Sequence, residues 1–409
     1  MATAASGTGP GTVPGNGASP ANVRYNRNRR GQLAIWWQEI DRTVLAVVLI
    51  LMGIGAVAVA AGSPASARRL STAHEKLSQL HFFWLHLRWQ FVGLCAMFWA
   101  SSLSKDSARR VGILIAAVML VGLVLVPVIG SEVNGARRWL KLGISIQPSQ
   151  FLGSGFPILL AWILSWRARD PNIPVVAICF CLMGLLGALL MAQPDFGSTM
   201  LFSGTFFVMI LLAGIPLKRI GMFAGLGVAG LVLMYFTYDN GRNRIDSFLS
   251  GGNAFDQVDL AQRTLLNGGW FGQGFWMGSR KMALPEAHTD YIFSVIGEEF
   301  GLVACMIIVM IYLALLTRVM LRLVDEEDLF TVLAASGIAS QFGGQAFINI
   351  LVNLQLFPSK GMTLPLISYG GSSTVAMCMT VGLLLAITRR NPFIKREKFS
   401  LRAVGDLSS

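Results

Sequence analysis

The sequence predicts an all-α polytopic membrane protein, and three observations lead to this fold class. The chain of 409 residues is 54% hydrophobic and only 13% charged, a balance outside the usual range of soluble globular domains. Long apolar runs recur along most of the chain, and most approach the ~20 residues that an α-helix needs to cross a bilayer. Polar residues are concentrated between these runs.

Ten runs qualify as candidate transmembrane helices. The fourth, fifth and sixth are short, and Pro194 with Gly197 predicts a tight turn between the fifth and the sixth. The ten candidates are Thr43–Ala61, Phe83–Leu103, Val111–Ile129, Phe151–Trp166, Pro174–Met191, Phe196–Ala213, Ile220–Tyr238, Tyr291–Leu316, Phe330–Leu354 and Pro365–Ile387.

An even number of spans places both termini on one side of the membrane. The larger share of Lys and Arg flanks the spans on that side, which predicts cytoplasmic termini. We therefore expect a disordered cytoplasmic tail over residues 1–40, a ten-helix membrane domain over 41–390 and a cytoplasmic C-terminal tail over 391–409. Residues 239–289 form the longest connection, a large periplasmic loop between helices 7 and 8, and a loop of this length is more often functional than idle.

The composition also excludes several classes of function. The net charge of +12 does not indicate nucleic-acid binding, because much of the basic excess lies beside apolar spans, where it sets topology and contacts anionic lipid. All five cysteines fall in apolar runs, so disulfides are not expected, and Cys179-x-Cys181 lacks the spacing of a zinc site.

The most informative segment is residues 284–290, which carries Glu286, His288 and Asp290 directly before the eighth span. Holding titratable groups next to a membrane span costs free energy, so their presence indicates a function. Asp290 is the best candidate for a general base that takes a proton from a sugar hydroxyl. The alternative is a helix N-cap, a role that Asp290 and Thr289 both suit. His288 suits a proton shuttle or a metal ligand, although a single His is a weak metal signal.

Cations on the predicted outer loops suit an anionic, lipid-linked substrate, because Lys and Arg can hold a pyrophosphate and neutralise it as it leaves. The glycines of Gly272-Gln-Gly274 and Gly278-Ser-Arg-Lys281 could cradle phosphate, but they lack the P-loop pattern. The cations of interest are Arg138, Arg244, Lys281 and Lys360.

Three further polar sites lie at or inside spans. Glu298 and Glu299 are predicted to face a cavity, to pair with a cation such as Arg88, or to be protonated, because an ionised pair in lipid is unfavourable. Asp195 suits a cap for the sixth span or a place at the site. Ser368 is a candidate substrate-binding residue. It opens the run Ser368-Tyr-Gly-Gly-Ser-Ser373, where paired glycines permit close packing or a break that lines a cavity.

Taken in order, several segments resemble the SEDS family of peptidoglycan glycan-strand polymerases, the FtsW/RodA proteins. The resemblance extends from about Asp41 to Pro392 and is most like the FtsW branch, in view of the basic cytoplasmic tail and the Asn267–Phe271 motif. The segments that carry it are Gly135–Leu140, Gln193–Gly197, Asn267–Gly274, Leu284–Asp290, Gly297–Glu299 and Lys360–Ser372.

The resemblance implies polymerisation of lipid II into glycan strands during septal cell-wall synthesis, in the bacterial inner membrane. It places the essential acid of the family on Asp290 and substrate-contacting cations on Arg138 and Lys360. Gln257 and Arg244 match recurrent loop positions of the family. Expected partners are a class B penicillin-binding protein (an FtsI-type transpeptidase) and other divisome membrane proteins. The sequence indicates no definite cofactor; the candidate is a divalent cation, Mg²⁺ or Mn²⁺, that would help to hold the pyrophosphate.

One departure from the family pattern lies at the start of the fourth span. Gln150 and Gly153 stand where the family usually has a Glu and a Lys. Losing both together is chemically coherent, because removing one partner of a buried ion pair would strand the other. Three alternatives remain open: an elongation-type RodA polymerase, a lipid II flippase, and a scaffold without polymerase activity.

Overall fold

The computed structural model describes residues 31–71, 76–133, 136–142, 144–168, 170, 172–193, 195–216, 257–357 and 361–390, together with isolated positions between 218 and 246. Within these ranges the chain is mostly helical. Residues 40–389 form one compact unit, and α2 (Gln32–Glu39) with Arg390 belongs to a second. The tail predicted to be disordered therefore contains a short helix, because its residues 33–37 are mostly apolar.

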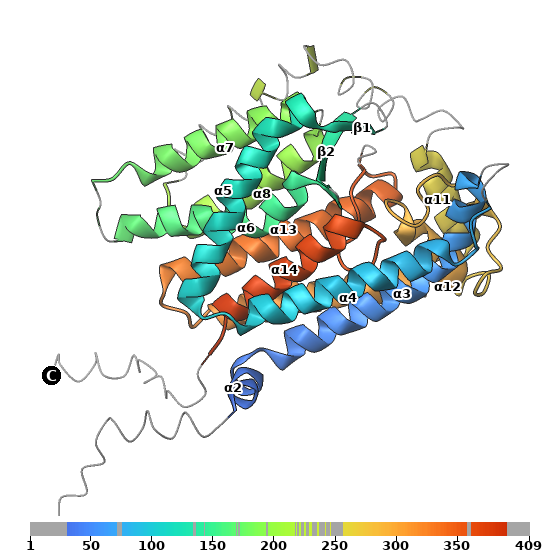
Figure 1. Cartoon of the computed structure of the whole chain (residues 1–409), viewed down its shortest axis with the longest axis horizontal. Coiled ribbons are helices and arrows are strands. Elements are labelled where there is room, and N and C mark those ends of the chain that lie inside the picture. Colours follow the sequence, from blue (N-terminus) through green and yellow to red (C-terminus); the bar gives the residue numbers. More distant parts are fainter. Residues whose placement is uncertain are drawn as a thin grey trace, which may run out of the picture. The chain divides into compact units, whose positions relative to one another are not determined.

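Each predicted span other than the seventh overlaps a helix, and the seventh lies largely outside the described ranges (Figure 1). The boundaries differ, for example at α3, which continues to Leu70, and at α14, which begins only at Gly371. In the described part of the chain, α3, α5, α7 and α12 are long and apolar enough to cross a membrane, and α8 and α14 are shorter apolar helices. The helices are α3 (Arg42–Leu70), α4 (His81–Ser102), α5 (Lys105–Ile129), α6 (Pro148–Ser165), α7 (Val175–Ala192), α8 (Phe196–Leu212), α11 (Gln257–Asn267), α12 (Ile292–Leu323), α13 (Leu329–Asn353) and α14 (Gly371–Ile387), with short 3₁₀ turns η1 (Trp166–Ala168) and η2 (Arg280–Met282).

A small antiparallel sheet departs from the all-α prediction. Strands β1 (Ser131–Val133), β2 (Ala136–Leu142) and β3 (Ile144–Ile146) pair in that order between α5 and α6. A bulge interrupts the β1–β2 pairing next to Glu132. The sheet positions Arg138, which sequence analysis placed in an irregular loop.

Close helix packing depends on small residues, as is usual for membrane bundles. Gly155 of α6 lies against the backbone of α5 at Gly112, and Gly382 of α14 lies against α4 at Met97. A side chain at either glycine would overlap with the neighbouring helix. Figure 1 shows α13 and α14 running between the group of α3 and α4 and the group of α5 to α8.

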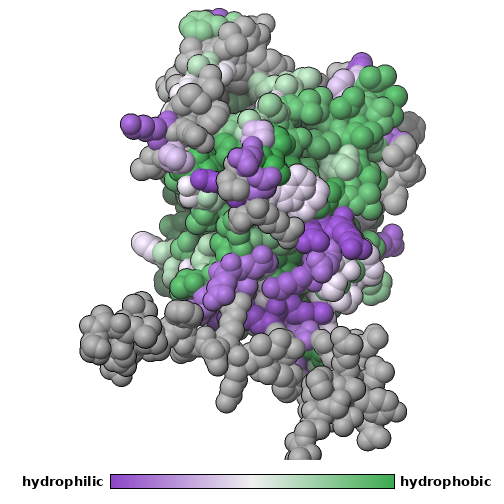
Figure 2. All heavy atoms as spheres, turned by 90° about the vertical axis from the view of Figure 1, so that its left-hand side faces the viewer, coloured by the Kyte–Doolittle hydropathy of each residue, from purple (hydrophilic) through white to green (hydrophobic). Residues whose placement is uncertain are grey.

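The outer surface of the helices is apolar. Leu114, Val121, Val128 and Phe207 are exposed to differing degrees, as expected for side chains that contact lipid. Figure 2 shows hydrophobic side chains over much of one face, with hydrophilic side chains gathered mainly in its lower part.

The start of α3 and the end of α12 meet on one side of the bundle. Asp41 caps α3 by accepting hydrogen bonds from the backbone N–H groups of Thr43 at 3.0 Å and Val44 at 3.2 Å. The same carboxylate pairs with Arg318 at 3.0 Å and with Arg322 at 2.5 Å, both near the end of α12. The start of α3 and the end of α12 therefore lie at the same level.

Candidate functional site

Asp290 lies in the turn that precedes α12 and is half-buried. It does not cap the helix: Tyr291 occupies the N-cap position of α12 and no side chain accepts a hydrogen bond there. Among the residues that the structure describes, no group hydrogen-bonds to its carboxylate. The carboxylate borders a small pocket lined by Asp290, Tyr291, Ile348, Asn349, Val352, Gly361 and Met362. The structure thus resolves the alternative that the sequence left open, because the side chain of Asp290 is not used as a cap.

The backbone around Asp290 is held at three successive carbonyl groups. The carbonyl of His288 accepts a hydrogen bond from the N–H of Tyr369 at 2.9 Å, and that of Thr289 accepts one from Ser368 Oγ at 2.6 Å. The Asp290 carbonyl accepts from Asn349 Nδ2 at 2.8 Å and from Asn353 Nδ2 at 3.2 Å. All the donors come from the last third of the chain, so α13 and the segment before α14 fix the position of this turn.

These bonds also assign a role to Ser368, for which sequence analysis predicted substrate contact. Ser368 is buried, and its Oγ accepts a hydrogen bond from the N–H of Leu364 at 2.8 Å while donating to Thr289. The hydroxyl thus donates one hydrogen bond and accepts one within the protein. Ser368 therefore supports the backbone beside Asp290.

A row of four buried amide side chains runs along one face of α13, and sequence analysis missed it. The four residues are spaced by four, which puts them one above another on the helix. Asn349 Nδ2 also donates to the carbonyl of Met362 at 2.6 Å, and Gln345 Nε2 donates to that of Thr363 at 2.9 Å. The signal was present in the sequence as polar residues every fourth position of an apolar run. The amide row consists of Gln341, Gln345, Asn349 and Asn353.

The electrostatic surroundings of Asp290 suit a base that works near neutral pH. Burial raises the pKa of Asp290 to about 7, the negative charge of Glu286 acts in the same direction, and the positive charge of Arg138 opposes both. A carboxyl group with this pKa is a far better proton acceptor than an ordinary aspartate when it is ionised.

His288 forms part of an aromatic stack. Its ring stacks on Tyr369 at 5.2 Å between centroids, lies 4.2 Å from Phe82, and its Nδ1 is 2.6 Å from Ser66 Oγ. Burial, with a smaller contribution from the charge of His86, lowers the pKa of His288 to about 4. The imidazole is therefore neutral at physiological pH and joins the Asp290 turn to α3 and α4. Within the described ranges, no group of three or more His, Cys, Asp and Glu is arranged to hold a metal ion.

Lys281 contradicts the expectation that it binds pyrophosphate. Its side chain is buried and forms an ion pair with Glu299. The sequence suggested Arg88 as a partner cation for the carboxylates of α12, and the structure instead pairs Glu299 with Lys281. Glu298 is also buried, and it accepts hydrogen bonds at 2.8 Å from Asn267 Nδ2 and from the backbone N–H groups of Arg280 and Lys281. These contacts fasten the loop after α11 onto α12.

The predicted phosphate-cradling glycines belong to the same contact. A Cβ atom at Gly272 would overlap with the backbone of Glu299, and one at Gly278 would lie 2.7 Å from Glu299 Oε1. These glycines let the loop approach α12 closely, so the space beside them is filled by α12 and is not open to a phosphate group. The structure thus contradicts the phosphate-cradle interpretation.

Arg138 contacts the turn between α7 and α8, and Asp195 is part of that turn. Arg138 Nε donates to the carbonyl of Gln193 at 3.2 Å, and the charge of Arg138 acts on Asp290. Asp195 is buried and caps α8, where it accepts from the N–H of Ser198 at 3.1 Å and from Ser198 Oγ at 2.7 Å. The capping role that sequence analysis considered for Asp195 is therefore confirmed.

The remaining predicted site residues lie beside Asp290 or outside the described ranges. Gln257 is exposed at the start of α11, and its Oε1 is 3.5 Å from the hydroxyl of Tyr291. Arg244 and Lys360 are not among the described residues. Gly361, which follows Lys360 in sequence, adopts φ +49°, and a Cβ atom there would lie 3.4 Å from Asp290 Oδ2. The positive φ favours glycine at this position, and the Cβ distance shows that the segment lies beside the carboxylate.

The departure at the start of α6 is accommodated by neutral polar contacts. Gln150 Oε1 accepts from Ser373 Oγ at 3.4 Å, and Ser373 in turn lies 2.8 Å from Thr363 Oγ1. A Cβ atom at Gly153 would lie 3.3 Å from Gln341 Nε2, so the amide row of α13 fills the space beside Gly153. Neither Gln150 nor Gly153 places an unpaired charge inside the helix bundle.

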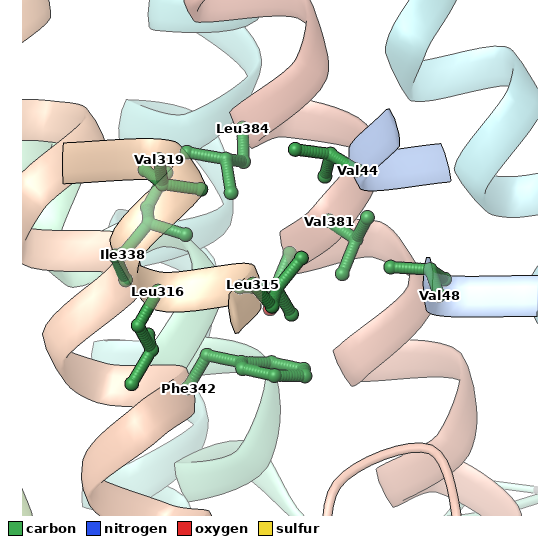
Figure 3. A pocket seen from close by; sticks show the side chains of 11 residues that line it. Val44, Val48, Leu315, Leu316, Val319, Ile338, Phe342, Val381 and Leu384 are labelled. Atoms are coloured by element: carbon green, nitrogen blue, oxygen red, sulfur yellow. The ribbon is translucent and has the colours of Figure 1, made fainter. Parts of the chain in front are cut away.

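A second pocket lies away from Asp290, between α3, α12, α13 and α14 (Figure 3). Its lining is apolar apart from Thr380, and it includes Val44, Leu315, Phe342 and Val381. Chemistry on a polar substrate needs titratable or charged groups, and this lining has none. Of these two pockets in the described part of the chain, the one beside Asp290 contains a titratable group, and it is the candidate site.

Comparison with known proteins identifies the family of the chain. Residues 41–392 match the model of the cell cycle protein family that comprises FtsW, RodA and SpoVE. The chain is 35% identical over 377 residues to the probable peptidoglycan glycosyltransferase FtsW of Caulobacter vibrioides, covering 92% of this chain and 96% of that protein. It is 34% identical over 378 residues to the protein of the same description from Alkalilimnicola ehrlichii, covering 89% of this chain and 92% of that protein.

Solved structures give the same result for the fold. One similar chain belongs to a structure described as structural coordination of polymerization and crosslinking by a peptidoglycan synthase complex, with a TM-score of 0.70, 27% identity and coverage of 85% of this chain and 97% of that chain. Another is the rod shape determining protein RodA of Thermus thermophilus, with a TM-score of 0.64, 25% identity and coverage of 86% and 97%.

Proposed function

Because the chain belongs to the FtsW, RodA and SpoVE family of cell cycle proteins, we propose that it is a peptidoglycan glycosyltransferase that polymerises lipid II. The observation that carries the proposal is Asp290: a carboxylate with no internal hydrogen-bond partner among the described residues, on a backbone held at three carbonyls. The names of the relatives support glycosyl transfer in peptidoglycan synthesis, and this geometry supports a base at Asp290.

In the proposed reaction, the carboxylate of Asp290 takes the proton from the 4-hydroxyl of the acceptor sugar. The resulting oxygen attacks the anomeric carbon of the donor sugar, and a β-1,4 bond forms with inversion. The bond between that carbon and the pyrophosphate breaks, and undecaprenyl pyrophosphate leaves with the bonding electron pair. A neutralised pyrophosphate is a good leaving group, so the reaction needs a base and cations rather than a second carboxylate.

Arg138 and Lys360 are the proposed cations for the leaving group. Arg138 is half-buried on β2, and its charge acts on Asp290. Lys360 directly precedes Gly361, which lies against the Asp290 carboxylate. A divalent cation held by the pyrophosphate could supplement these charges. Lys281 is not part of this set, because Glu299 already neutralises it in a buried pair.

The proposal extends to topology and partners. It places ten helices across the bacterial inner membrane, with both termini in the cytoplasm and the loop of residues 239–289 in the periplasm. The enzyme would work at the division septum with a class B penicillin-binding protein, which cross-links the new strand, and with other divisome membrane proteins. The apolar helices and the FtsW relatives support this placement.

The experiment that tests the proposal supplies lipid II to the purified protein in liposomes, together with its cognate penicillin-binding protein. Glycan ladders on a gel are the expected product. A parallel assay follows translocation of labelled lipid II across the same liposomes. Translocation without polymer would favour a flippase, and a stable complex that yields neither would favour a scaffold. Depletion in cells separates the two branches, because loss of a septal enzyme gives filaments and loss of an elongation enzyme gives round cells.

A further inference from the structure

The loop between α11 and α12 exposes an unusual set of large apolar side chains. Phe271 is 85% exposed and Met277 is 75% exposed, although exposed patches of this kind rarely face water in soluble domains. We refer to residues 268–278 as the aromatic loop. Its exposed members are Trp270, Phe271, Phe275, Trp276 and Met277.

The aromatic loop is fixed to α12 at a break in that helix. Gly301 has φ 84° and ψ 174°, so the helical hydrogen bonds on either side of it are lost. The backbone of the loop replaces them, with donors and acceptors on both sides of the break. The replacement bonds are Gln273 N to Glu298 O at 2.8 Å, Gly274 N to Glu299 O at 3.0 Å, Leu302 N to Gly269 O at 2.9 Å and Val303 N to Trp270 O at 3.2 Å.

The length of α12 beyond this break matches the thickness of a bilayer. At 1.5 Å per residue, the helix from Leu302 to its end at Leu323 is about 33 Å long. The hydrocarbon core of a bilayer is ~30 Å thick. The break at Gly301 therefore lies where α12 leaves the hydrocarbon core, and the buried carboxylates Glu298 and Glu299 lie beyond it.

The distance along α3 places the aromatic loop at the same depth in the membrane as the length of α12 does. Asp41 ties the start of α3 to the end of α12, so both helices can be measured from the same membrane face. Trp276 Nε1 donates to the carbonyl of Ala60 at 3.1 Å. Ala60 lies about 27 Å along α3 from Arg42, again close to the thickness of the hydrocarbon core.

We propose that the aromatic loop lies in the lipid interface of the membrane face opposite Asp41, with Trp270, Phe271 and Met277 in contact with lipid. Trp and other aromatic side chains are enriched at this depth because their rings suit the headgroup boundary. The exposed apolar side chains Met306, Ile307 and Met310 continue the surface along α12. Exposed Arg280, close by, suits lipid phosphate groups.

The contact has a structural consequence for the candidate site. The loop is bonded to the first turns of α12, and the Asp290 turn directly precedes that helix. Lipid contact at the loop therefore holds Asp290 at a constant height above the membrane. This inference does not depend on the proposed reaction, because it rests on helix lengths and backbone contacts alone.

The test attaches an environment-sensitive fluorophore to Met277→Cys in the full-length protein in lipid nanodiscs. Cys95 and Cys181 are exposed thiols and are first replaced by Ser. Ser78→Cys is the matched control, because Ser78 is exposed on the connection that follows α3, beyond the level of Ala60. Phe271→Cys provides a second labelled position in the loop, so that the result does not depend on one variant.

The expected result is blue-shifted emission at Met277 and Phe271, several-fold stronger quenching by lipids with a nitroxide near the headgroup, and little quenching by iodide. The Ser78 label should show the opposite pattern. Iodide quenching at the loop equal to that at Ser78, without lipid quenching, would overturn the proposal. Adding the penicillin-binding protein gives a third measurement: if the partner removes lipid quenching and shields both labels, the loop is a protein-docking surface and the lipid proposal is wrong.

Discussion

Asn349 donates its side-chain amide to two backbone carbonyls at once, that of Asp290 at 2.8 Å and that of Met362 at 2.6 Å. One buried side chain of α13 therefore sets the spacing between the turn that carries the proposed base and the segment that follows Lys360. Sub-ångström control of this kind matters, because a small displacement of a catalytic group can reduce the rate by about 10²-fold.

Asn349→Leu preserves volume but removes the donor, and we expect it to lower kcat for lipid II polymerisation by roughly 10-fold to 100-fold with little change in KM. Gln341→Met is the matched control, because Gln341 lies on the same face of α13 and contacts Thr205 rather than the Asp290 turn. Asn349→Gln retains the donor and should recover part of the rate. Equal losses in the Leu and Met variants would show that the amide row affects only stability.

The activity should depend on pH through Asp290. Its pKa is raised to about 7, and the base must be ionised, so kcat should rise with pH through about 7. Glu286→Gln removes a negative charge and should move this limb to lower pH, whereas Arg138→Gln should move it to higher pH. A pH–rate profile of the three proteins checks both directions, and a limb that moves in neither variant contradicts the assignment.

The same pKa has a consequence for stability with a definite sign. A carboxyl group whose pKa is raised in the folded state binds its proton more tightly there than in the unfolded chain. Its contribution to the free energy of unfolding is therefore largest below the unfolded pKa and declines as pH rises toward 7. Asp290→Asn should flatten this decline, which thermal unfolding of the purified protein between pH 5 and 7.5 can measure.

The ion pair between Lys281 and Glu299 should be structural. Lys281→Met leaves a buried carboxylate without its cation and is expected to destabilise the protein by about 3–5 kcal/mol. Adding Glu299→Gln removes the charge and keeps one acceptor oxygen for the backbone of the aromatic loop, so the double variant should recover part of the loss. Thermal unfolding reports the comparison. Additive effects of the two changes would contradict the pairing.

The departure at α6 gives a further prediction. Gly153→Lys alone places a cation beside Gln341 without an acid and should destabilise the protein by about 3–5 kcal/mol. Gln150→Glu added to it restores an i, i+3 pair on the same helix and should recover stability. Unfolding midpoints of the single and double variants decide the matter, and a double variant as unstable as the single one contradicts this account.

Local patterns were enough to predict most of the helices and to single out Asp290, because a run of about 20 apolar residues and a polar cluster beside it are visible in sequence. Contacts between distant residues were not predictable in this way. Lys281 and Glu299 are separated by a folded loop, and nothing local shows that the Lys is buried. The sheet at β1–β3 was missed because its strands are short and it has no long alternating pattern. The amide row was visible at intervals of four residues, but its meaning required the position of the Asp290 turn.

The central claim is that Asp290 is the base, and its most direct test is polymerisation of lipid II by Asp290→Asn beside Glu286→Gln, each with the penicillin-binding protein. Asn has nearly the same shape as Asp, so the fold and the complex should persist in both variants. We expect Asp290→Asn to lower kcat by roughly 10²-fold to 10⁴-fold, while Glu286→Gln continues to produce glycan ladders. Glycan made by Asp290→Asn at the wild-type rate would contradict the account.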